Sequence, residues 1–139
     1  MNTQFKAARA ENYRVSDRSA ADIRYLVIHF TANDGDTAKN NADYFAREAP
    51  GVSAHFFVDE KEIWQSVREK DIAWHCGTRG MYFHPYCRNA NSLGIELCSR
   101  KQGEKYYFAP ETVKNARNFV RYLMKKYDIP LANVVRHYD

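Results

Sequence analysis

Residues 24–30 read Arg-Tyr-Leu-Val-Ile-His-Phe, a short run of apolar and branched side chains that ends in a polar loop. Such a run predicts a buried strand. Residues 91–98 read Asn-Ser-Leu-Gly-Ile-Glu-Leu-Cys and predict another strand. Its alternation divides the side chains between two faces, with Leu93, Ile95 and Leu97 on one and Gly94, Glu96 and Cys98 on the other.

Other segments predict two helices and further strands. One helix is expected over residues 37–49, with Thr37 as its N-cap and Pro50-Gly51 after its end. A second is expected over residues 113–127, where apolar side chains recur at spacings of three and four. Because strands alternate with helices, we expect the α/β class, with a central mixed β-sheet flanked by helices. The additional strands are expected at residues 53–58 and 63–67, which form a hairpin, and at 71–75 and 133–137.

Size and composition narrow the class of protein. A chain of 139 residues can bury one core, and residues 1–22, polar and mixed, are expected to form an N-terminal arm. Three cysteines without a C-x-x-C pair predict free thiols in a reducing compartment. We see no apolar signal peptide or membrane span, and therefore expect cytoplasmic synthesis and no membrane partner. The net charge of +4 suits solubility or contact with polyanionic wall polymers, and no dense basic stripe indicates a nucleic-acid partner.

His29 and His137 share a sequence context, because each stands at the carboxyl end of an apolar strand. Ligand sites in α/β sheets usually lie at such strand ends. Two imidazoles that meet there could hold Zn²⁺ through nitrogen. The alternative is a pair of partly buried histidines with a structural role.

Glu96 is the second candidate, because it lies in the middle of a strand between Ile95 and Leu97. Burying a carboxylate in such a place is costly unless it has a partner or a task. One such task is that of a general base beside a metal-bound water. A half-exposed strand glutamate that faces solvent is the alternative.

A rival cluster consists of His75, Cys76, His84 and Cys87. These are zinc-ligand types, although their spacing matches no familiar zinc finger. Cys76 could also be a nucleophile activated by His75. We expect the two to point to opposite faces of a strand, which argues against that dyad.

Five motifs in order resemble one family, the zinc-dependent N-acetylmuramoyl-L-alanine amidases, which are related to phage endolysins and peptidoglycan-recognition proteins. The resemblance covers about residues 24–139, and the segment from Cys76 to Cys98 looks most like endolysins of phages or prophages of Gram-positive hosts. The motifs are Val27-Ile-His-Phe-Thr-Ala32, Val52-Ser-Ala-His-Phe56, Ala73-Trp-His-Cys-Gly77, Asn91-Ser-Leu-Gly-Ile-Glu-Leu97 and Val135-Arg-His-Tyr-Asp139.

The resemblance implies a fold like that of the peptidoglycan-recognition proteins and a role for individual residues. His29 and His137 match the two zinc-binding histidines, and Glu96 matches the catalytic glutamate. Some members instead use a tyrosine at the position of Ala54. His55 matches a histidine that supports the site, and the segment lining the substrate groove is matched by Trp74 and His75.

The resemblance also implies a departure at the C-terminal end. The family's third zinc ligand lies about eight to ten residues after the second histidine, with a catalytic lysine two residues before that ligand. We therefore expect an N-terminal arm at residues 1–22 and an amidase catalytic domain at residues 23–139 that is truncated at its C-terminal end. On this basis the 139-residue chain is expected to bind zinc weakly and to be nearly inactive as it stands.

Of three functions we favour the first, because Glu96 and both histidines are retained. The first is hydrolysis of the amide between N-acetylmuramic acid and L-alanine in peptidoglycan, by a phage or prophage endolysin that acts on the cell wall after release. The second is a non-catalytic peptidoglycan-binding module. The third is a cysteine hydrolase that uses Cys76 or Cys98. A separate cell-wall-binding domain is a possible partner of the first two.

Overall fold

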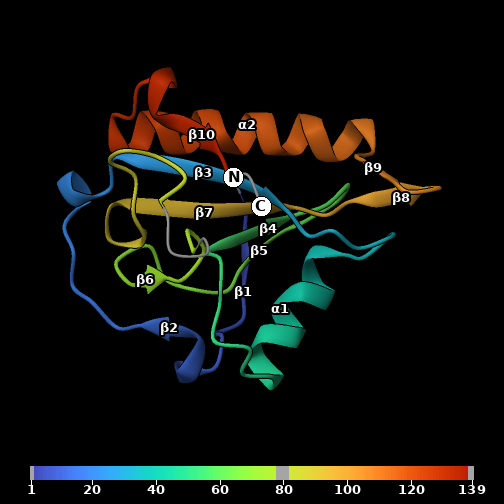
Figure 1. The fold of residues 1–139 in the computed structure, drawn as a ribbon, viewed down its shortest axis with the longest axis horizontal. Helices are drawn as coiled ribbons and strands as arrows, with labels where there is room; N and C mark the ends of the chain where they lie inside the picture. Colours follow the sequence, from blue (N-terminus) through green and yellow to red (C-terminus); the bar gives the residue numbers. More distant parts are fainter. Residues whose placement is uncertain (1, 78–81, 138–139) are drawn as a thin grey trace.

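The computed structural model describes residues 2–77 and 82–137. Within them, the main sheet has six strands in the order β1-β5-β4-β7-β3-β10 (Figure 1). Two smaller pairs, β2 with β6 and β8 with β9, lie outside it. The strands of the main sheet are β1 (Gln4–Phe5), β3 (Tyr25–Phe30), β4 (Phe56–Val58), β5 (Ile63–Gln65), β7 (Ser92–Leu97) and β10 (Val134–Arg136).

The centre of the sheet is parallel and its edge is antiparallel. β7 pairs in parallel with β3 on one side and with β4 on the other, and β10 pairs in parallel with β3. β5 returns antiparallel to β4, which confirms the expected hairpin. The sheet is therefore mixed, as predicted, and the carboxyl ends of β3, β7 and β10 lie at one edge.

Two helices cover opposite faces of the sheet (Figure 1). α2 (Pro110–Tyr127) packs on the face that carries Leu93 and Ile95, and its Phe119 belongs to the same apolar cluster. It starts three residues before the predicted helix, because the proline at its first position already has the φ that a helix needs. α1 (Ala38–Arg47) contacts β4 and β5 on the other face, and Thr37 caps it by accepting from the backbone N–H of Asn40.

The N-terminal residues join the sheet, which sequence patterns did not indicate. β1 pairs with β5, and β2 (Tyr13–Arg14) pairs antiparallel with β6 (Ile72–Ala73). Between them, buried Asn12 donates to the carbonyl of Phe45 in the last turn of α1 and to that of Glu48, which caps the helix. The arm thus holds α1 and the β6 region against the body of the protein.

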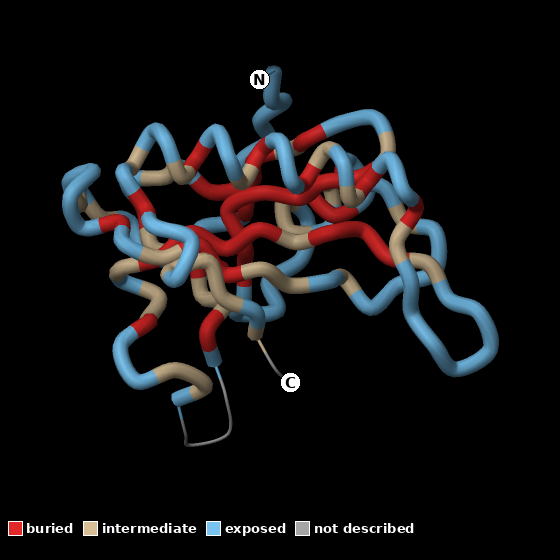
Figure 2. The backbone as a smooth tube through the Cα atoms, turned by 90° about the horizontal axis from the view of Figure 1, so that it is seen from above, coloured by how far each residue is buried: buried red, intermediate tan, exposed pale blue. Residues whose placement is uncertain are grey.

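A hairpin of β8 (Arg100–Gln102) and β9 (Lys105–Tyr107) was also not predicted. Gly103 takes a φ of +62° in its turn, a conformation that glycine adopts without steric cost. Figure 2 shows the buried backbone concentrated in the middle of the molecule, with exposed segments around it.

Candidate functional site

The strand register brings His29 next to Glu96. The two residues are direct partners in the parallel β3–β7 ladder, and Glu96 is also the partner of Phe57 in the β7–β4 ladder. Side chains at partnered positions share a face of the sheet. That face is opposite the one on which Ile95 packs against α2, in agreement with the alternation expected for this strand.

His137 approaches the same place from the neighbouring strand. It follows β10 directly, and its backbone N–H donates to the carbonyl of Ile28 at 3.2 Å. The ring centroids of His137 and His29 lie 5.0 Å apart. Two histidines separated by more than a hundred residues in the sequence therefore meet at the carboxyl end of the parallel strands.

A pocket of about 220 Å³ collects five of the six candidate site residues. Glu96 also lines a neighbouring polar pocket of about 460 Å³ beside α1, which includes Asn33, Asn40 and Asn41. The Glu96 carboxylate thus lies where the two pockets adjoin, beside the imidazoles of His29 and His137. The five candidates lining the smaller pocket are His29, Trp74, His75, Glu96 and His137.

The charge state of His29 suits metal binding. Burial, followed by the nearby His137, lowers the pKa of His29 to about 3. The imidazole is therefore neutral at pH 7 and has a nitrogen lone pair for a metal ion. Within residues 2–77 and 82–137, no group of three or more His, Cys, Asp or Glu side chains is placed to hold a metal ion. His29 and His137 offer imidazole nitrogen, a ligand type that suits zinc.

Polar side chains that sequence patterns did not single out hold Trp74 and His75 in place. The side-chain oxygen of Asn89 accepts from the backbone N–H groups of His75 and Cys76, at 3.1 and 2.8 Å. The hydroxyl of Ser53 accepts from the backbone N–H of Trp74 at 3.1 Å. Nothing in the local sequence marks Asn89 or Ser53 for this task, because their partners lie in other segments.

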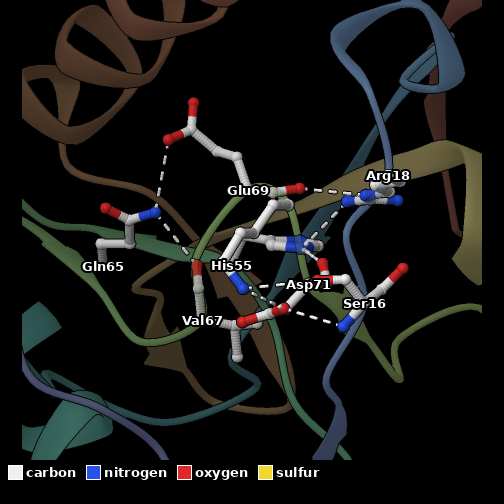
Figure 3. Close-up of polar contacts among 8 residues, drawn as sticks. Ser16, Arg18, His55, Gln65, Val67, Glu69 and Asp71 are labelled. Atoms are coloured by element: carbon white, nitrogen blue, oxygen red, sulfur yellow. Dashed lines mark hydrogen bonds and ion pairs between the residues drawn. The ribbon is translucent and has the colours of Figure 1, made fainter.

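His55 lies behind the pocket and does not line it. Its Nδ1 accepts from the backbone N–H of Gly94 at 3.1 Å. Its Nε2 donates to the carbonyl of Asp71 at 2.9 Å (Figure 3). Complete burial lowers the pKa of His55 to about 3, so the ring is neutral. Arg18, from the N-terminal arm, points at this ring and donates to the carbonyl of Glu69 (Figure 3).

The expected separation of His75 and Cys76 was wrong. The Sγ of Cys76 lies 3.6 Å from the Nδ1 of His75, because both residues follow β6 and do not belong to a strand. A hydrogen bond with Cys87, helped by His75, lowers the pKa of the Cys76 thiol below its ordinary value. Cys76 is nevertheless buried and does not line the pocket that contains Glu96.

The rival zinc cluster does not assemble among the described residues. The Nδ1 of His84 accepts from the backbone N–H groups of Tyr86 and Cys87 instead, and its ring packs on Tyr25. Cys98 is buried on the α1 side of β7, where burial raises the pKa of its thiol. The last two residues of the fifth motif, 138–139, lie outside the described residues.

One further finding concerns membranes. No helix within residues 2–77 and 82–137 is long and apolar enough to cross a bilayer.

Comparison with known proteins gives a consistent result. The family described as Amidase_2, N-acetylmuramoyl-L-alanine amidase, matches residues 19–139. N-acetylmuramoyl-L-alanine amidase CwlL of Bacillus licheniformis is 34% identical over 127 residues, which cover 86% of this chain and 34% of CwlL. The amidase XlyA of Bacillus subtilis is 36% identical over 115 residues, which cover 81% of this chain and 36% of XlyA. The chain thus spans about a third of the length of these curated relatives.

Solved structures agree with the sequence comparison. The catalytic domain of XlyA superimposes with a TM-score of 0.75 at 31% identity, covering 99% of this chain and 84% of that one. PlyL superimposes with a TM-score of 0.77 at 29% identity, covering 99% and 81%. Since the family match extends over most of the sequence and the relatives share the fold, this chain belongs to the N-acetylmuramoyl-L-alanine amidase family.

Proposed function

We propose that this chain is the catalytic part of a zinc-dependent endolysin that cleaves bacterial peptidoglycan. The bond cut is the amide between the lactyl group of N-acetylmuramic acid and L-alanine. One observation carries the proposal: Glu96 and His29 are partners in adjacent parallel strands, and with His137 they line the same pocket. Family membership supports the reaction class, because the relatives are named for it.

His29 and His137 would hold the zinc ion. Imidazole nitrogen is a common zinc ligand, and the lowered pKa of His29 leaves its ring unprotonated at neutral pH. Catalytic zinc usually has about three protein ligands, of which this pair supplies two. A zinc ion bound here would supply Lewis acidity to the scissile carbonyl and to the attacking water.

Glu96 would move the proton. Its carboxylate lines the pocket beside His29, on the face of β7 away from α2. A carboxylate there can take a proton from the attacking water and pass it to the leaving amine of L-alanine. Trp74 would form a wall of the substrate groove, and the polar pocket beside α1 would extend that groove beyond Glu96.

His55 would support the site from behind. Its hydrogen bond with the Gly94 backbone holds β7 two residues before Glu96. A separate cell-wall-binding domain is a partner that this proposal accommodates, because the amidase relatives are about three times as long as the matched region.

The decisive experiment follows new L-alanine amino termini released from purified peptidoglycan. A form of the protein that is active to begin with is assayed with added zinc, with a chelator and as the Glu96→Gln variant. We expect release that needs zinc and Glu96. Binding to peptidoglycan without any release would identify a binding module instead. Release that resists the chelator and is abolished by thiol alkylation would indicate a cysteine hydrolase.

A further inference from the structure

We infer that His75 is a positioning residue that fixes the tautomer of His29, so that His29 presents Nδ1 to the metal. The inference rests on the proposed function for one point, the assignment of His29 as a zinc ligand. Otherwise it follows from a chain of hydrogen bonds that runs from the carbonyl of Arg88 through Ser92 and His75 to His29. This role differs from the groove-lining role expected for His75.

The chain of hydrogen bonds begins at Ser92. Its hydroxyl oxygen lies 2.7 Å from the backbone carbonyl of Arg88 and 3.1 Å from the Nε2 of His75. A carbonyl can only accept, and a hydroxyl has a single proton to donate. Ser92 therefore donates to Arg88 and must accept from His75, which places a proton on the Nε2 of His75.

The next step fixes His29. A neutral imidazole carries one proton, and with that proton on Nε2 the Nδ1 of His75 has a lone pair. The Nε2 of His29 lies 3.0 Å from that Nδ1 and must donate to it. The proton of His29 is thereby assigned to Nε2, and the lone pair of its Nδ1 remains for the metal.

The opposite direction of these hydrogen bonds is disfavoured. If His75 donated to His29 from Nδ1, its Nε2 would need a proton from Ser92, which already donates to Arg88. The Sγ of Cys76 also approaches the Nδ1 of His75, but that contact is 3.6 Å long, whereas the Nε2 of His29 lies at 3.0 Å, so the contact with His29 is the stronger of the two.

The backbone around His75 holds its ring in the orientation that these hydrogen bonds require. Asn89 binds the backbone N–H of His75, as described above. Below the ring lies Gly94, where an added Cβ would come within 2.7 Å of the Cγ of His75. The site therefore needs glycine at position 94 for close approach of the ring. The rings of His75 and His29 meet at 81°, with centroids 5.1 Å apart.

The consequence is a gain in metal affinity from a residue that does not touch the metal. A free imidazole exchanges its proton between the two nitrogens, and a hydrogen-bond partner that selects one tautomer prepares the other nitrogen for binding. Removing such a partner commonly lowers metal affinity by about 10–100-fold.

The test reads the tautomer of His29 directly. Long-range ¹H–¹⁵N NMR spectra of the metal-free protein distinguish a protonated Nε2 from a protonated Nδ1. In the unmodified chain we expect His29 to carry its proton on Nε2. A spectrum with the proton on Nδ1 would overturn the inference, whatever the protein's activity.

Two substitutions of His75 form a matched pair. His75→Asn can place its amide oxygen where Nδ1 was and retain an acceptor, whereas His75→Phe keeps a ring of similar size without one. We expect His29 to keep its tautomer in the Asn variant and to become a mixture in the Phe variant. Zinc affinity, measured by competition with a chromogenic chelator, should fall about 10–100-fold for Phe and less for Asn. Equal tautomers and equal affinities in both variants would overturn the inference.

Ser92→Ala provides an independent test if the Phe variant does not fold. It removes the acceptor that fixes the proton of His75, so we expect mixed tautomers of both histidines. An unchanged His29 tautomer in this variant would contradict the proposed series of hydrogen bonds. The tautomer readout is also separate from hydrolysis. If the variants changed the tautomer of His29 but the unmodified protein did not bind zinc, the positioning role of His75 would be supported and the proposed function would be refuted.

Discussion

The two faces of β7 have different tasks, although they alternate along a single strand of six residues. On one face, Leu93 and Ile95 are completely buried against α2. On the other, Gly94 makes room for the His75 ring and Glu96 lines the pocket. The first face lowers the free energy of folding by removing apolar surface from water, and the second holds polar groups in the geometry that chemistry requires.

This difference implies that substitutions at neighbouring residues of β7 can have opposite effects on stability and on activity. A change on the apolar face should remove stability while the remaining folded molecules keep their activity. A change on the site face should remove activity while the fold survives. Substitutions at consecutive positions of β7 therefore test the division, since distance from the site is nearly constant among them.

The largest effect is expected for Glu96→Gln. The amide has the size of the carboxylate but cannot act as a base, so the rate of L-alanine amino-terminus release should fall by about 10²–10⁴-fold. Thermal unfolding should shift little, because Glu96 is only half-buried. A variant that kept more than about a tenth of the rate would show that Glu96 is not the general base.

Ile95→Ala is the matched change on the apolar face. It removes a completely buried side chain and should lower the free energy of unfolding by about 2–5 kcal/mol, which urea denaturation measures. The rate per folded molecule should stay close to that of the unmodified chain. If Ile95→Ala abolished hydrolysis in a folded protein, the two faces of β7 would not be independent.

Gly94→Ala should lower both stability and zinc affinity by a moderate amount. The added methyl group meets the His75 ring, and such overpacking typically costs about 1–3 kcal/mol. Displacing the ring should also weaken the hydrogen bond to His29 and lower zinc affinity. Stability and zinc affinity are measured on the same preparation. The control is Gly77→Ala, whose added Cβ has no atom of the described residues within 4 Å. A change in neither quantity would show that the ring can move aside freely.

The sequence was most informative where one local period covers a whole element. The alternation in residues 91–98 and the three-to-four spacing in residues 113–127 correctly predicted a strand and a helix. Each of these elements buries one regular face, so the spacing of its own apolar residues shows which face packs against the rest of the protein. The placement of His29 beside Glu96 followed once both strands were parallel and adjacent.

Sequence patterns missed the features that depend on partners far away in the chain. β1 and β2 have two residues each, too few to show any period, and they form because β5 and β6 offer unpaired edges. Ser92 and Asn89 act through single hydrogen bonds to His75, for which no spacing rule exists. The meeting of His75 with Cys76 was misjudged because the strand was expected to extend past Ala73.

The last effect concerns the loss of stability in acid, and it tests whether His55, behind the site face of β7, stays neutral in the folded protein. The pKa of His55 is lowered from 6.5 to about 3 by burial, so the unfolded chain binds a proton at this residue near pH 6 and the folded chain does not. Its contribution to stability is therefore complete above pH 6.5 and is lost as the pH falls towards 3.

Between pH 7 and 5 the linkage amounts to about 2 kcal/mol for one such histidine. His29 and His75 shift in the same direction, to about 3 and about 4, and add to the decline. His55→Asn can still accept from the Gly94 N–H but cannot titrate. It should lower stability at pH 7 and reduce the loss between pH 7 and 5 by roughly one histidine's share. Urea denaturation at both pH values measures this, and an identical decline in the two proteins would show that His55 is protonated in the fold. Because carboxylates titrate mainly below this window, the difference reports on the imidazole that holds β7 from behind.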